Sequence, residues 1–131
     1  MKKSRWMWTL VFVLLMAGCF AACGKKEETV TFRQVDAKQA KEMMDTEEDY
    51  IILDVRTEEE YESGHIKGAL LIPDYELEEC VQQEMEKDQL ILVYCRSGNR
   101  SKKSAQLLAE MGYTNVVEFG GIIDWPYEIE Q

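Results

Sequence analysis

The sequence predicts an α/β domain with a largely parallel sheet, and two features of the chain carry this prediction. Short apolar, β-branched runs alternate with segments of helical periodicity. Two of these runs, residues 50–55 and 90–94, are apolar almost without interruption, as is typical of parallel strands covered on both faces. The chain has no internal repeat and no low-complexity tract, so we expect one domain over residues 29–131.

The domain is expected to begin with an edge strand and a capped helix. Val30 and Phe32 alternate with polar residues, as on an edge strand. Asp36 is the expected N-cap of a helix over 36–44, and Gln39 completes a capping box. The helix residues expected to face the core are Ala37, Ala40 and Met44.

After the strand at 50–55, Thr57 and Glu60 have the spacing of a capping box that opens a short helix, and Gly64 ends it. Further along, we expect a short strand at 69–72, a helix around 76–86 and the strand at 90–94.

The last elements follow the same alternation. Residues 101–111 have helix-forming composition with apolar positions on one face, and Gly112 closes the helix. A strand is expected at 116–119. Gly120 and Gly121 then turn the chain toward a terminal helix or turn near Trp125.

Cys95 lies between a predicted strand and a predicted helix, at the strand's carboxyl end, where ligands of parallel sheets gather. Free amides and the helix dipole at such a turn favour a thiolate and a bound anion. Two arginines add fixed positive charge, and a glycine permits the positive φ of a tight loop. The residues expected to form this anion-binding loop are Arg96, Ser97, Gly98, Asn99 and Arg100.

A cysteine at the end of a buried strand is more often a packed apolar residue than a nucleophile. Here the flanking arginines argue against that reading, because burying them unpaired would cost several kcal/mol. We therefore interpret Cys95 as a nucleophile, able to attack an electrophilic sulfur or phosphorus atom.

The first 18 residues are interpreted as a signal peptide. Three basic residues precede an apolar run, residues 6–17, of about a dozen residues. That run is shorter than the roughly 20 residues that span a bilayer, although an uncleaved anchor stays an alternative. The small residues before Cys19 resemble the lipobox of bacterial lipoproteins, in which the cysteine carries the lipid, and Cys23 offers a weaker second site.

This resemblance implies a lipid-anchored protein on the extracytoplasmic side of the cell membrane, with a polar tether over residues 19–28. Removal of residues 1–18 leaves 12 basic and 25 acidic residues, a formal charge of −13. Such a surface repels nucleic acid and anionic headgroups, so we expect no nucleic-acid partner and membrane contact through the lipid alone. Residues 96–103 instead carry four cations and no acid.

No residues have metal-ligand spacing and no glycine-rich nucleotide loop is present, so we expect neither a metal nor another cofactor. Cys80 is expected to pack on a helix face; the alternative is a resolving thiol for Cys95.

Several short motifs together resemble a single-domain rhodanese, a sulfurtransferase. The resemblance implies a five-stranded, mainly parallel sheet flanked by helices, with the cysteine loop as the active site. The motifs are Asp54-Val55-Arg56, Glu60-Tyr61, residues 64–69, residues 95–101, and Gly120-Gly121 with Trp125.

The resemblance further implies that Cys95 takes a sulfane sulfur from a small anionic donor such as thiosulfate. Its persulfide then passes the sulfur to a thiol, another thiophilic acceptor or a protein acceptor. Arg96 and Arg100 would orient the donor. Asp54 and Arg56 resemble the family's strand-end pair, read as an ion pair beside the site, and His65 falls in a structural turn.

Two alternatives stay open. Phosphatases that use a cysteine and an arginine have five residues between them, whereas four separate Cys95 from Arg100. Phosphatase or arsenate reductase activity is therefore a minor alternative. The other is a sulfur-carrier or redox-sensing module whose Cys95 is modified without rapid turnover.

Overall fold

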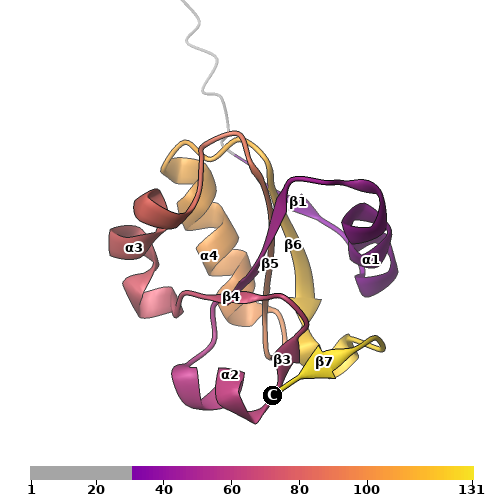
Figure 1. Cartoon of the computed structure of the whole chain (residues 1–131). Helices are drawn as coiled ribbons and strands as arrows, with labels where there is room; N and C mark the ends of the chain where they lie inside the picture. The colour runs from indigo at the N-terminus through magenta and orange to yellow at the C-terminus, as the bar shows by residue number, and fades with distance from the viewer. Residues whose placement is uncertain (1–30) are drawn as a thin grey trace, which may run out of the picture.

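A computed structural model of the chain describes residues 31–131. The predicted signal peptide, Cys19, Cys23 and Val30 lie outside the described residues. The described part confirms the α/β prediction, with every neighbouring pair of strands in the main sheet parallel (Figure 1). In spatial order the five strands are β1 (Arg33–Gln34), β6 (Val116–Gly121), β5 (Leu90–Cys95), β2 (Tyr50–Asp54) and β4 (Leu70–Leu71).

Helices cover both faces of this sheet. In Figure 1, α1 lies on one side, and α3 and α4 lie on the other. The helices are α1 (Ala37–Thr46), α2 (Glu58–Ser63), α3 (Leu77–Glu84) and α4 (Asn99–Glu110), with short 3₁₀ turns η1 (Asp74–Glu76) and η2 (Ile122–Asp124). Within the described residues, no helix is long and apolar enough to cross a bilayer.

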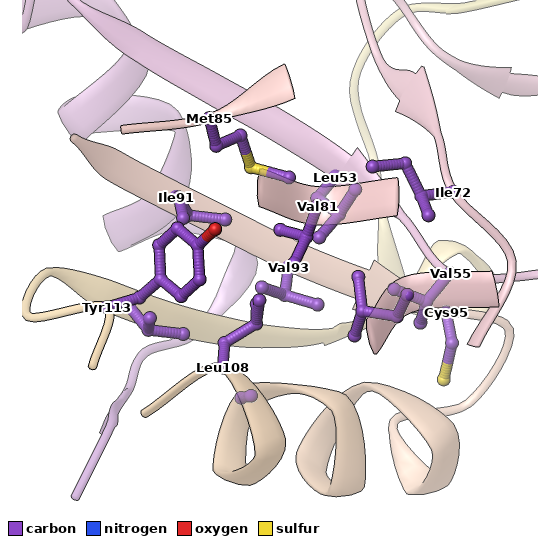
Figure 2. Packing of buried hydrophobic residues seen from close by; sticks show 13 residues of the cluster. Leu53, Val55, Ile72, Val81, Met85, Ile91, Val93, Cys95, Leu108 and Tyr113 are labelled. Carbon is purple, nitrogen blue, oxygen red and sulfur yellow. The ribbon is translucent and has the colours of Figure 1, made fainter. Parts of the chain in front are cut away.

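Each face of the sheet has its own apolar core. Side chains alternate along a strand, so consecutive residues of β5 serve opposite cores. Tyr94 packs on the α1 side and Cys95 on the side of α3 and α4. Figure 2 shows the core on the side of α3 and α4, with Cys95 at one end and Met85 and Tyr113 at the other. The carboxyl end of β5 therefore presents its last side chain toward the start of α4.

Both predicted capping boxes are present. Asp36 accepts a hydrogen bond from the Gln39 amide, and the Gln39 side chain accepts one from the Asp36 amide. Thr57 and Glu60 form the same reciprocal pair at the start of α2. Gly64 ends α2 with a φ of 148°, a conformation that favours glycine.

The structure differs from the prediction near the chain's end. The two glycines predicted as a turn are instead the last residues of β6. An antiparallel ribbon, β3 (His65–Ile66) with β7 (Ile129–Glu130), also lies outside the prediction, because strands of two residues carry no readable periodicity. In place of the helix predicted around 76–86, the structure has η1 followed by α3, which ends at Glu84.

Candidate active site

The loop after β5 turns its amides toward the Cys95 thiol. Cys95 is the last residue of β5, and α4 begins four residues later at Asn99. Gly98 has a φ of 102°, which L side chains rarely adopt, and its N–H donates to Cys95 Sγ over 3.0 Å. Cys95 is only 1% exposed. The thiol therefore lies inside a cradle of hydrogen-bond donors at the start of a helix.

This cradle lowers the pKa of Cys95. Burial alone raises the pKa of a thiol, because it disfavours the charged form. Ser101, through its side chain and its amide, and the amides of Gly98 and Ser97 oppose burial and outweigh it. The net effect brings the pKa of Cys95 below its ordinary value, so more of the residue is thiolate at neutral pH.

Ser101 is in turn held by a buried carboxylate that the sequence reading missed. The Ser101 hydroxyl donates to Glu118 Oε1 over 2.6 Å, and the Gly120 amide donates to the same oxygen over 2.8 Å. Glu118 lies on β6 and is 2% exposed. Its signal in the sequence was an acid within the apolar strand 116–119, a position where a carboxylate needs partners.

The end of β6 packs directly against the loop. Between Glu118 and Gly121 the register with β5 is irregular, because three steps along β6 match two along β5. Gly120 lies in this bulge with a φ of 92°. A Cβ on Gly121 would lie 2.0 Å from the Arg96 carbonyl oxygen. Only glycine at this position lets the strand approach the loop backbone so closely.

The structure separates the roles of the loop's polar residues. Arg100 is partly buried and forms two hydrogen bonds with the Glu60 carboxylate, at 2.7 and 2.8 Å. Arg96 is exposed and makes no ion pair within residues 31–131. Ser97 and Asn99 are exposed as well. Of the two guanidinium groups, Arg100 is the one held in place beside the loop.

Asp54 and Arg56 form a buried ion pair at the carboxyl end of β2. Arg56 Nη2 lies 2.7 Å from Asp54 Oδ2, and Arg56 Nε and its amide also donate to the carboxylate. The Tyr94 hydroxyl donates to Asp54 Oδ2 over 2.6 Å and accepts from the Ile66 amide. Arg56 also donates to the Gly64 carbonyl. Every one of these contacts ties β2 to its surroundings, none to the thiol.

His65 and Cys80 lie outside the loop. The His65 ring stacks on Tyr61 with ring centroids 3.7 Å apart and hydrogen-bonds to the Tyr61 carbonyl and to Glu130. It lies on β3 rather than in the predicted turn. Cys80 is half-buried, carries a free thiol and packs against the core on the side of α3 and α4.

A thiolate among amide donors, beside a fixed guanidinium, can attack an electrophilic sulfur and hold the charge that results. Comparison with known proteins points to the same kind of chemistry. The family model for the rhodanese-like domain matches residues 36–126. The thiosulfate sulfurtransferase PspE of Escherichia coli K12 is 38% identical over 73 residues, which are 55% of this chain and 70% of PspE.

A sulfurtransferase of Allochromatium vinosum is 34% identical over 93 residues, 70% of this chain and 86% of that protein. The solution structure of the rhodanese-like domain of the Anabaena protein Alr3790 has a TM-score of 0.71 at 30% identity, covering 76% of this chain and 80% of that one. The chain belongs to the rhodanese-like family. It is a sulfurtransferase of the rhodanese type.

Proposed function

We propose that this protein moves a sulfane sulfur from a small anionic donor such as thiosulfate to a thiophilic acceptor, through a persulfide on Cys95. The observation that carries the proposal is the set of hydrogen-bond donors around the thiol: the Gly98 N–H lies 3.0 Å from Sγ. Donors in a nearly water-free site stabilise an anion strongly and need no rearrangement when it forms.

In the first step, the Cys95 thiolate attacks the outer sulfur of thiosulfate. A bond forms between Cys95 Sγ and that sulfur, and the sulfur–sulfur bond of thiosulfate breaks. Sulfite leaves with the bonding electron pair, and Cys95 carries a persulfide anion. The lowered pKa of Cys95 favours this step, because the thiolate is the nucleophile.

In the second step, the thiolate of the acceptor attacks the outer sulfur of the persulfide, and Cys95 departs as a thiolate. The acceptor is a small thiol or a thiol of a partner protein, and cyanide replaces it in an assay. The loop amides that favour the Cys95 thiolate also favour its departure, so the same geometry serves both steps.

The test uses the purified full-length protein incubated with thiosulfate and measured by intact mass. We expect a gain of one sulfur atom that Cys95→Ser lacks, and thiocyanate formation when cyanide is added. Absence of both products contradicts the proposal. An adduct that forms readily but is passed on slowly favours a sulfur carrier, and hydrolysis of an aryl phosphate favours the phosphatase alternative.

We also propose that Cys19 carries a lipid that holds the domain on the extracytoplasmic face of the cell membrane. The support is in the sequence, where a basic segment and a short apolar run precede small residues and a cysteine. Cys19→Ser should move the protein from the membrane fraction to the soluble one. Continued attachment would indicate Cys23 or an uncleaved helix.

A further inference from the structure

The Arg100 guanidinium is chelated by a carboxylate that is itself held from the other side. Arg100 Nη1 and Nη2 donate to Glu60 Oε2 and Oε1 over 2.7 and 2.8 Å. The Thr57 amide and hydroxyl donate to Glu60 Oε2 over 3.0 and 3.1 Å. Because the capping box orients Glu60 independently of Arg100, the carboxylate is pre-positioned to receive the guanidinium.

The pair is charged but close to neutral as a unit. The Arg100 hydrogen bonds lower the pKa of Glu60 to about 2, so its carboxylate is ionised at physiological pH. Glu60 raises the pKa of Arg100 most, and the nearby Cys95 thiolate and Asp74 carboxylate raise it further. Arg100 lies in the first turn of α4, directly after the loop that surrounds the thiol, and Glu60 offsets the positive charge that it brings there.

Arg96 differs from Arg100 in this respect. It directly follows Cys95, it is exposed, and no acid within residues 31–131 pairs with it. An anion that approaches the thiol thus meets one uncompensated guanidinium and one that is already neutralised. The positive field at the thiol is weaker than the count of arginines in the loop suggests.

We propose that Glu60 is a specificity-determining residue of the Cys95 site. By neutralising Arg100, Glu60 limits the affinity of the site for anionic donors. This inference rests on the proposed sulfur transfer for its biological meaning. The effect itself is electrostatic: it concerns only the electric field at the Cys95 thiol. Removing the Glu60 charge should strengthen the response of Cys95 to anions, whereas a purely structural role predicts a loss of reactivity.

The variant Glu60→Gln removes the charge and keeps most of the geometry, because glutamine also serves in a capping box. Glu59→Gln is the matched control. Glu59 is an exposed acid at the neighbouring position of α2 that makes no ion pair within residues 31–131. Both variants change the net charge equally, so any difference between them belongs to the contacts that Glu60 makes with Arg100 and Thr57.

The primary measurement is the rate of Cys95 alkylation by anionic iodoacetate divided by the rate with neutral iodoacetamide. Mass spectrometry of the peptide that contains Cys95 keeps Cys80 out of the readout. Using the full-length protein at low salt, we expect the ratio to rise about threefold to tenfold in Glu60→Gln and less than about twofold in Glu59→Gln. Added salt should shrink the rise.

A second variant, which removes the positive partner of the pair instead, guards against misfolding of the first. Arg100→Gln leaves Glu60 uncompensated near the thiol, so the ratio should fall below that of the unmodified protein. The double variant Glu60→Gln with Arg100→Gln loses both charges, and its ratio should return close to the original one. A ratio that is unchanged or lowered in Glu60→Gln, or a double variant that does not return, overturns the inference.

Sulfur transfer provides a separate readout. If the proposed function holds, Glu60→Gln should lower KM for thiosulfate with a smaller effect on kcat. If the alkylation ratios behave as expected but no variant forms a persulfide, the proposed function fails while the assignment of Glu60 stands. The two ideas are therefore distinguished by the same set of proteins.

Discussion

The Cys95 loop and the Asp54–Arg56 pair lie at the carboxyl ends of neighbouring strands, β5 and β2, and they use similar groups to opposite effect. Asp54 is fully buried, and its carboxylate accepts hydrogen bonds from the Arg56 and Tyr94 side chains. Cys95 is almost as deeply buried, but its sulfur accepts a hydrogen bond from the loop that follows β5. That loop also carries exposed polar residues.

The difference shows what separates a structural polar cluster from one that favours an anionic thiol. Around Asp54 both charges are matched in place, so the cluster joins elements and has no group left for a ligand. Around Cys95 the donors outnumber the acceptors, so the loop favours a negative charge on sulfur. Because Tyr94 and Cys95 are consecutive on β5, one strand serves both regions from its two faces.

The largest expected effect comes from Asp54→Asn, which leaves the Arg56 charge buried without a carboxylate. Removing one partner of a buried ion pair costs about 3–5 kcal/mol of unfolding free energy. Urea unfolding measures the loss. The pH dependence of Cys95 alkylation in the folded protein should stay unchanged, and a shifted profile with normal stability would break the comparison.

A smaller loss is expected for Tyr94→Phe. The variant removes the hydroxyl that donates to Asp54 and accepts from the Ile66 amide. Burial and the Asp54 charge raise the pKa of Tyr94, so this hydroxyl stays protonated and keeps donating. Losing it should cost about 1–3 kcal/mol, again with Cys95 reactivity preserved. Equal stability of the variant and the unmodified protein would show that the hydrogen bonds of this hydroxyl do not stabilise the fold.

Ser101→Ala, unlike the two variants above, should change the reactivity of Cys95. Ser101 hydrogen-bonding lowers the pKa of Cys95, so its loss raises that pKa and reduces the thiolate fraction at neutral pH. The curve of alkylation rate against pH should move to higher pH by about half a unit to one unit. Ser104→Ala, which removes a buried hydroxyl further along α4, is the control and should leave the curve in place.

The smallest effect is expected for Tyr113→Phe, which lies in neither region. In the part of the chain that the structure describes, the Tyr113 hydroxyl is the one buried side-chain polar atom without a hydrogen-bond partner. Its removal should be neutral or stabilise the fold by up to about 1 kcal/mol. Thermal unfolding measures this, and a clear loss of stability would mean that the hydroxyl has a partner.

Local chemistry made much of the fold predictable. The capping boxes at Asp36 and Thr57 each involve residues three positions apart, so their partners are visible in the sequence. The runs at 50–55 and 90–94, apolar almost without interruption, likewise indicate a sheet covered on both faces, and they form β2 and β5. The β3 and β7 strands were not predictable, because they pair residues more than sixty positions apart with only two residues each.

The candidate site divides along the same line. By itself the sequence determined the position of Cys95 between a strand and a helix, and with it the helical amides and the glycine loop, because these depend on neighbouring residues. Only the tertiary structure decided that Arg100 pairs with Glu60, 40 positions away, and that Ser101 meets Glu118. The physical reason is that a side chain's charge partner depends on which strands become neighbours, and the order β1-β6-β5-β2-β4 brings distant segments to one end of the sheet.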